Sequence, residues 1–278
     1  MIDSETRVLG VIGDPVSHSL SPAIQNAALE HLHMNARYFA FPVARERLRE
    51  MTDAVRVLRM PGLNVTLPHK EAILPLLDRL GPEAARVGAV NTVVNREGVL
   101  EGENTDVHGF REALRRVRRR GMKTALVLGK GGAARAVFLV LMEQGFSEIL
   151  VACRRLAQGR KMVESLGGGS VGRVIPWDAR EKAEADLLVN ATPLGTNVRD
   201  PLPAPARVVR GAKGAIDLVV RPRGTRWVAL CRSYGIPAED GSIMLVAQGR
   251  ESLRLWFGKT PSFEVMLRAL RAGGGAGS

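Results

Sequence analysis

Short apolar runs alternate along the chain with longer stretches in which apolar positions recur every three or four residues. This alternation is typical of an α/β protein. Apolar runs that end at Gly, Pro or polar residues predict strands. The predicted strands lie at residues 6–13, 36–43, 62–67, 89–98, 99–106, 123–129, 147–153, 186–192 and 214–220.

The amphipathic stretches predict helices. The pair Ser21-Pro22 predicts a helix start, with Ser21 as N-cap and Pro22 as the first helical residue, and this helix should extend to about Met34. Further helices are predicted at 45–60, 133–145, about 242–257 and about 262–271. We therefore expect two α/β domains, with a boundary near Asp106 and a second series of strands that starts near Lys123.

Composition places the chain among globular proteins of the cytoplasm. It has 278 residues, of which 45% are hydrophobic, and no apolar run approaches the roughly 20 residues that span a bilayer. The N-terminus lacks the basic and apolar regions of a signal peptide. The two cysteines, Cys153 and Cys231, have no metal-type spacing, so we expect a reducing compartment and no metal site.

The net charge of +12 makes nucleic acid a partner to consider. The densest basic stretch, residues 111–120, predicts a helix whose Leu114 and Val117 face inward, and a solvated helix face explains its charge. No aromatic platform or nucleic-acid motif accompanies it, so we expect no specific nucleic-acid binding. A positive field would also attract anionic small molecules.

A glycine-rich turn follows the predicted strand 123–129 and opens the next helix. Its sequence is G-x-G-x-x-A, and the residues that it would bring to a nucleotide are Gly129, Gly131, Gly132 and Ala133. Small residues let a pyrophosphate approach the N–H groups of a helix N-terminus. An ordinary glycine-rich loop remains the alternative, because the pattern alone is weak.

The end of the next strand favours NADP over NAD. NAD sites place Asp or Glu there to bind the ribose 2′-hydroxyl. This strand ends instead in Arg154 and Arg155, and two guanidiniums suit a 2′-phosphate. In the alternative interpretation, the two arginines only face solvent.

Seven stretches that contain polar groups, several of them at probable strand ends, together resemble the shikimate dehydrogenase family. They are GDPVSHSLSP (13–22), NVTLPHK (64–70), GAVNTV (88–93), GENTDVHG (102–109), NATPLG (190–195), DLVVRPRGT (217–225) and DGSIMLVAQG (240–249). The resemblance covers about residues 6 to 270, with the motifs in the family's order.

The resemblance implies NADP-dependent, reversible reduction of 3-dehydroshikimate to shikimate in aromatic amino acid biosynthesis. It implies a substrate domain at 1–105 and a Rossmann-type NADP domain at 106–236, with a cleft between them. Residues 237–278 would return to the substrate domain, with a flexible tail from about 272. It implies a monomer or homodimer that binds the small substrate and no membrane.

The resemblance also assigns roles to individual residues. Lys70 and Asp106 would form the catalytic pair. The substrate-binding residues would be Ser17, Ser19, Asn64, Thr66, Asn91 and Gln248. Besides the glycine-rich turn and the two arginines, the residues near the cofactor would be Thr192, Leu218, Gly241 and Met244.

Lys70 and Asp106 suit this chemistry. Hydride addition to a ketone creates negative charge on oxygen, which an ammonium stabilises and protonates. A neighbouring carboxylate keeps the lysine charged and oriented. Alone, Lys70 would be taken for an exposed loop lysine, and Asp106 for a helix cap. The histidines, His69 among them, are expected in surface or loop positions.

The chain departs from the family pattern at three places. Gln25 stands where His is common, Cys153 and Arg155 replace Asn and Thr in the cofactor stretch, and Val220 replaces a tyrosine near the substrate. Val220 leaves open a paralogue that acts on quinate or an amino-shikimate. A non-catalytic NADP-binding sensor and a nucleic-acid binder are the alternatives from other classes.

Overall fold

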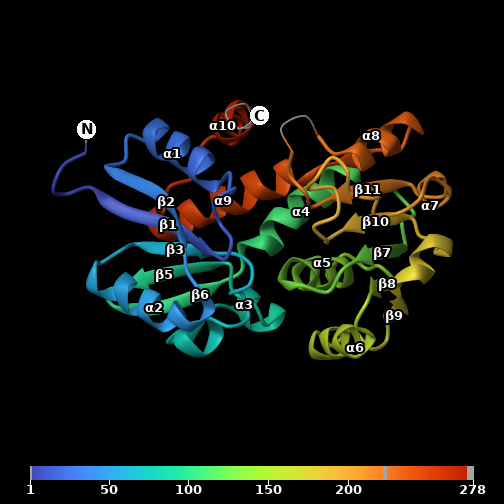
Figure 1. Cartoon of the computed structure of the whole chain (residues 1–278), viewed down its shortest axis with the longest axis horizontal. Coiled ribbons are helices and arrows are strands. Elements are labelled where there is room, and N and C mark those ends of the chain that lie inside the picture. Colours follow the sequence, from blue (N-terminus) through green and yellow to red (C-terminus); the bar gives the residue numbers. More distant parts are fainter. Residues whose placement is uncertain (1, 222–223, 274–278) are drawn as a thin grey trace. The chain divides into compact units, whose positions relative to one another are not determined.

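The structure, a computed structural model, describes residues 2–221 and 224–273. The chain divides into two compact units (Figure 1). Unit 1 comprises Met1–His108 and Leu245–Ser278, and unit 2 comprises Gly109–Met244. The boundaries expected from the sequence lie three and eight residues earlier, and they stay predictions as functional domain limits.

Unit 1 contains a mixed six-stranded sheet with the order β2-β1-β3-β5-β6-β4. Its strands are β1 (Arg7–Gly13), β2 (Ala36–Pro42), β3 (Gly62–Val65), β4 (Arg79–Leu80), β5 (Thr92–Arg96) and β6 (Val99–Glu103). Strand β5 is antiparallel to both β3 and β6, whereas β1 and β3 are parallel. The carboxyl ends of β1, β3 and β6 therefore share one edge of the sheet with the amino end of β5.

Five helices belong to unit 1 wholly or in large part. They are α1 (Ser21–His31), α2 (Leu48–Val57), α3 (Pro82–Val87), α9 (Gly241–Phe257) and α10 (Phe263–Gly273). Helix α2 closes the core through Leu48 and Val55, which pack with Leu63 of β3 and Leu100 of β6. Helix α10 packs against α1, so the chain's last helix joins its first.

Two predictions about helix ends need correction. Ser21 is the first residue of α1 rather than its cap, because Leu20 holds the cap position and no side chain caps this helix. The tail expected from about 272 begins inside α10, and residues 274–278 lie outside the described residues.

Unit 2 contains six parallel strands with the order β12-β11-β10-β7-β8-β9. They are β7 (Thr124–Leu128), β8 (Glu148–Cys153), β9 (Gly172–Pro176), β10 (Leu187–Asn190), β11 (Gly214–Asp217) and β12 (Ala238–Glu239). This is the strand order of a dinucleotide-binding sheet, and the order reverses between β7 and β10. The predicted two-domain α/β fold with a Rossmann-type unit is confirmed.

The continuous apolar runs of β7 and β10 are explained by their burial. Leu126, Val127 and Val189 have no exposed area, as expected for central parallel strands covered on both faces. The helices of this unit are α4 (Thr105–Val117), whose first residues belong to unit 1, α5 (Gly132–Glu143), α6 (Leu156–Ser165), α7 (Ala206–Arg210) and α8 (Arg226–Ser233).

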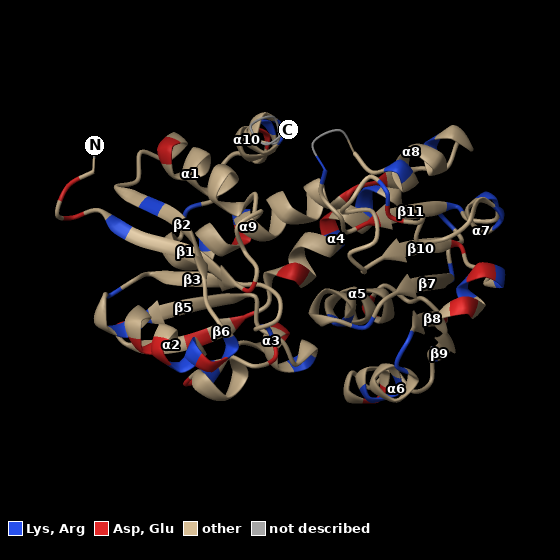
Figure 2. Ribbon diagram, viewed as in Figure 1, with Lys and Arg blue, Asp and Glu red and all other residues tan. Residues whose placement is uncertain are grey.

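The basic residues are spread over both units (Figure 2). In α4, Leu114 and Val117 are buried as predicted. Arg115 and Arg116 both bind Glu112, and Arg118 lies over the ring of Phe146, 5.4 Å from its centroid. Several of the positive charges in this stretch therefore already have partners within the protein. No helix among the described residues is long and apolar enough to cross a membrane.

Candidate functional site

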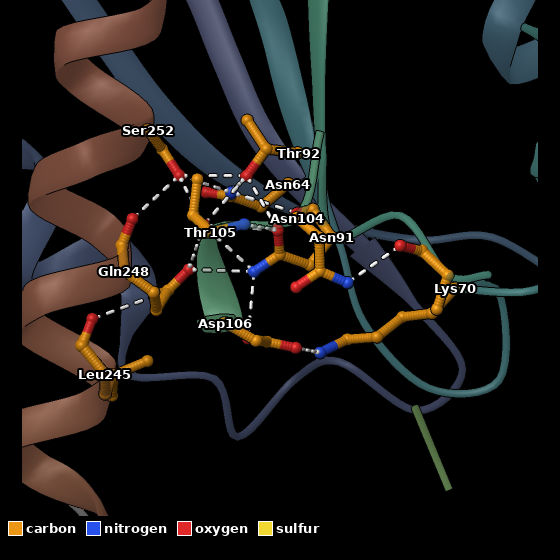
Figure 3. A network of polar contacts seen from close by, with 11 residues as sticks. Asn64, Lys70, Asn91, Thr92, Asn104, Thr105, Asp106, Leu245, Gln248 and Ser252 are labelled. Carbon is orange, nitrogen blue, oxygen red and sulfur yellow. Dashed lines mark hydrogen bonds and ion pairs between the residues drawn. The ribbon is translucent and has the colours of Figure 1, made fainter. Parts of the chain in front are cut away.

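The sheet of unit 1 explains how Lys70 and Asp106 meet. Lys70 lies in the loop after β3, and Asp106 lies in the first turn of α4, directly after β6. Because β3 and β6 point the same way, both residues leave the sheet at the same edge. Their side chains form an ion pair between Lys70 Nζ and Asp106 Oδ2 (Figure 3). These side chains are only 13% and 7% exposed, so water screens the pair weakly.

Asn91, just before β5, joins the same group of side chains. Its Nδ2 donates to Asp106 Oδ1 at 2.9 Å, to Thr105 Oγ1 at 3.0 Å and to Gln248 Oε1 at 3.4 Å (Figure 3). Its Oδ1 accepts from the backbone N–H of Thr105 at 2.7 Å. Both oxygens of Asp106 are thus bound, one by an ammonium and the other by an amide.

Gln248 comes from far along the chain. It lies on α9, and its side chain is buried beside Thr105 and Asn91. Its Nε2 donates to the carbonyl of Leu245 on the same helix. The structure therefore brings Lys70, Asp106, Asn91 and Gln248 together from four segments.

The other expected substrate residues lie at the same sheet edge or behind it. Ser17 is exposed and Ser19 partly buried, in the loop between β1 and α1, where Ser19 Oγ accepts from the N–H of Ser21. Thr66 continues β3, and its N–H donates to Ile12 in β1. Asn64 faces inward from β3 and is 5% exposed.

His69 lies in a loop, as expected, but its side chain has no exposed area and is therefore not a surface group. Its Nε2 donates to the carbonyl of Val43 at 2.6 Å. The backbone carbonyl of the next residue, Lys70, accepts from the N–H of Val90 at 2.8 Å. These two bonds fix the loop that carries Lys70. Its hydrogen-bond partner Val43 is 26 residues away in the chain, so no local signal reveals the position of His69.

In unit 2, the glycine-rich turn has the shape that a pyrophosphate needs. Gly129 has a φ of +106°, and a Cβ there would lie 2.8 Å from the carbonyl oxygen of Ala191. A Cβ on Gly131 would meet no atom within 4 Å, so open space lies in front of the turn. Gly132 and Ala133 begin α5, whose first N–H groups point to that space. The turn lies where the strand order reverses, and these residues fit a dinucleotide.

Arg154 and Arg155 follow β8 directly, and both are exposed. Since β7 and β8 are parallel neighbours, with Leu128 opposite Ala152, the arginines lie at the same sheet edge as the turn. The region therefore has guanidiniums where an NAD site would have a carboxylate.

Of the four other residues expected near the cofactor, Thr192 and Leu218 lie in connections of unit 2, whereas Gly241 and Met244 lie in the first turn of α9. Thr192 follows β10, and its hydroxyl donates to Asn190 Oδ1 at 2.6 Å. Leu218 follows β11, and a Cβ on Gly241 would lie 2.3 Å from its carbonyl oxygen, so only glycine allows that approach. Met244 is buried at 7% exposure.

Asp217, at the end of β11, is a buried group to which the sequence assigned no separate role. Its Oδ1 accepts from Asn190 Nδ2 at 2.8 Å, and its Oδ2 accepts from the hydroxyl of Thr225 at 2.7 Å. Burial raises the pKa of this carboxyl, and the hydrogen bonds from Thr225, from the backbone of Val219 and from Asn190 oppose that rise. Asp217 thus joins the loops that follow β10 and β11.

Comparisons with known proteins agree with this architecture. Residues 11–93 match the family model described as the shikimate dehydrogenase substrate binding domain, and residues 244–271 match that of the shikimate 5′-dehydrogenase C-terminal domain. A shikimate dehydrogenase (NADP(+)) of Rubrobacter xylanophilus is 44% identical over 281 residues, covering 98% of each chain.

Solved structures agree as well. A crystal structure of shikimate 5-dehydrogenase from Thermus thermophilus, in complex with NADP(H) and shikimate, is 39% identical with a TM-score of 0.83, and the match covers 96% of this chain and 99% of that one. A shikimate dehydrogenase in complex with NADP+ is 32% identical with a TM-score of 0.89, covering 98% and 97% of the two chains. With this sequence identity, coverage and shared fold, the chain belongs to the shikimate dehydrogenase family.

Proposed function

We propose that this chain is an NADP-dependent shikimate dehydrogenase, which reversibly reduces 3-dehydroshikimate to shikimate. The observation that carries the proposal is the buried ion pair of Lys70 and Asp106, which lies in the unit that matches the family's substrate binding domain. The relatives named above support the choice of substrate and cofactor.

In this proposal, NADPH supplies the hydride that reduces the ketone. The Nζ of Lys70 stabilises the negative charge that develops on the ketone oxygen and donates a proton to it. Asp106 Oδ2 accepts a hydrogen bond from that ammonium and holds it in place. Asp106 Oδ1, which accepts from Asn91 in this structure, is placed to accept from a substrate hydroxyl.

The family resemblance supplies the remaining substrate contacts, and their positions in unit 1 support them. We assign the substrate carboxylate to the hydroxyls of Ser17 and Ser19, which lie in the loop after β1. Thr66, Asn91 and Gln248 would bind the substrate's hydroxyl groups.

The cofactor contacts belong to unit 2. The turn formed by Gly129, Gly131, Gly132 and Ala133 would hold the pyrophosphate at the N-terminus of α5. The 2′-phosphate would lie at the guanidiniums of Arg154 and Arg155. Thr192, Leu218, Gly241 and Met244 would line the rest of the dinucleotide site.

The catalytic role of Lys70 is tested by Lys70→Ala, with Lys259→Ala as a matched control that removes an exposed lysine from the same unit. We expect Lys70→Ala to lower kcat by about 10² to 10⁴, because the proton donor is lost. The Kd for NADP should stay within about twofold of wild type, since the cofactor residues are intact. Reduced-nicotinamide absorbance and calorimetry give the two readouts. Activity that survives Lys70→Ala would refute the role.

Substrate and cofactor preference is tested by kcat/KM for shikimate and quinate, each with NADP and with NAD. The proposal predicts that shikimate with NADP gives the highest value. A higher value for quinate would identify the paralogue that Val220 leaves open. The cytoplasmic location and the state of monomer or homodimer stay predictions.

A further inference from the structure

A single buried hydroxyl, that of Ser252, joins the segments that carry the proposed site. Ser252 lies one helical turn after Gln248 on α9 and has no exposed area. Its Oγ donates to the carbonyl of Gln248 at 3.0 Å. The same oxygen lies 3.0 Å from Thr92 Oγ1 and 3.3 Å from Thr105 Oγ1 (Figure 3). One hydroxyl thus connects α9 with β5 and α4.

Asn64 enters this cluster from β3, and all of its polar atoms are already bound. Its Oδ1 accepts from the hydroxyl of Tyr38 at 2.7 Å. Its Nδ2 carries two hydrogens and faces three acceptors within 3.1 Å: the carbonyl of Asn91, Thr92 Oγ1 and Ser252 Oγ. The side chain of Asn64 therefore bonds no side chain that is assigned to the substrate or to the catalytic pair, whereas the amide of Asn91 bonds Asp106 and Gln248.

Thr92 connects Asn64 to the side chain of Asn91. Its hydroxyl donates to Asn91 Oδ1 at 3.1 Å, and the backbone N–H of Thr105 donates to the same oxygen. With its oxygen held in this way, the amide of Asn91 turns its nitrogen to Asp106 and Gln248. Thr92 itself has no exposed area. The buried hydroxyl of Thr92 therefore helps to set the orientation of the Asn91 amide.

We propose that Asn64, Thr92 and Ser252, named here the support cluster, are positioning residues that fix Asn91 and Gln248 for substrate binding. Asn64 acts through this cluster and does not touch the substrate. The proposal rests on the proposed function, because it assigns substrate binding to Asn91 and Gln248. In a buried, water-excluded cluster, each hydrogen bond is strong and each lost partner is costly. Removing one member should therefore disturb the two amides.

The test uses the full chain with Ser252→Ala and Thr92→Val, which remove one hydroxyl each and change little volume. We expect KM and Kd for shikimate to rise about tenfold or more, since small misplacements of binding groups are costly. The Kd for NADP should stay within about twofold of wild type. Thr92→Ser, which keeps the hydroxyl, should recover most of the lost affinity.

A control separates positioning from stability. Val55→Ala opens a cavity in the apolar core of the same unit, which contains none of the three support-cluster residues. It should lower the thermal midpoint and leave KM for shikimate unchanged when all variants are assayed well below their midpoints. If Ser252→Ala and Thr92→Val behave like Val55→Ala, the support cluster is only structural and the proposal is wrong.

A double-mutant cycle tests the role of Asn64. If Asn64 acts through the support cluster, the effects of Asn64→Ala and Ser252→Ala on the Kd for shikimate should overlap in the double variant. Effects that multiply in full would mean that Asn64 contacts the substrate independently, and would overturn its assignment. A wild-type chain that does not oxidise shikimate with NADP would refute the proposed function first, and this proposal with it.

Discussion

Asp186 ties together the first residues of the two central strands of unit 2. It precedes β10, and its Oδ2 accepts from the backbone N–H groups of Lys123 and Thr124, at 2.7 and 3.0 Å, where β7 begins. Its Oδ1 pairs with Lys213 Nζ at 2.6 Å. Burial alone would raise the pKa of this carboxyl, but the ion pair and the two N–H donors outweigh it and lower the pKa from 3.8 to about 2. The charged form therefore stabilises the folded unit.

The size of this contribution follows from the difference between the two pKa values. A pKa lowered by nearly two units corresponds to about 2 kcal/mol of stability at neutral pH. The side chain of Asp186 is only 17% exposed, so solvent screening reduces this stabilisation only a little. Because the folded pKa lies below the unfolded one, the stabilisation is complete well above pH 3.8 and is lost as the pH falls towards 2. About half should remain near pH 3.

The variant Asp186→Asn keeps an acceptor for the N–H groups but removes the charge. We expect its free energy of unfolding to lie about 2 kcal/mol below wild type at pH 7, with the gap reduced by about half near pH 3. Urea unfolding measures this, with Trp177 and Trp227 reporting on unit 2 in a Trp256→Phe background. Lys213→Gln, at a side chain 52% exposed, should cost less than about 1 kcal/mol. A gap that does not change with pH would refute the reasoning.

Three further predictions concern unit 2. Arg154→Ser should raise the Kd for NADP by about 10- to 100-fold and leave that for NAD unchanged, since one charge-assisted contact to a phosphate is lost; an equal loss for both cofactors in calorimetry would contradict it. Gly129 has a φ of +106°, and a Cβ there would lie 2.8 Å from the carbonyl oxygen of Ala191, so Gly129→Ala should lower the thermal midpoint more than Gly145→Ala, where a Cβ meets nothing within 4 Å. Equal losses of thermal midpoint in the two variants would contradict the steric argument. Burial raises the pKa of the Cys231 thiol to about 12, so iodoacetamide at pH 8 should label it only after unfolding, and rapid native labelling seen by mass spectrometry would count against this.

The central strands of unit 2 could be predicted because their physical signal is local. The run at 123–129 is apolar throughout, and a strand covered on both faces requires that pattern. Strands β4 and β12 were not predicted, because two residues carry no periodicity. Strand β9 and helices α6, α7 and α8 were not predicted either. The two strands predicted at 89–98 and 99–106 are observed as β5 and β6, which pair antiparallel around a turn where Glu97 and Gly98 both adopt positive φ.

The site was predictable only in part. Family resemblance supplied Lys70 and Asp106, and the sheet explains why residues so far apart meet. Ser252 gave no signal, because a serine on an amphipathic helix is usually taken to face solvent. It accepts a hydrogen bond from Asn64, which is 188 residues away in the chain. The burial of polar groups with such distant partners can be recognised only in the folded structure.

The saturated amide of Asn91 has a consequence for how a ligand is recognised. Its nitrogen and oxygen both have protein partners before any ligand arrives. A ligand hydroxyl that bonds the Asn91 side chain must therefore displace an existing hydrogen bond, so the net gain in affinity is the difference between two similar interactions. Such an exchange favours easy release of product over tight capture, and a molecule that lacks the hydroxyl leaves the resting contacts undisturbed.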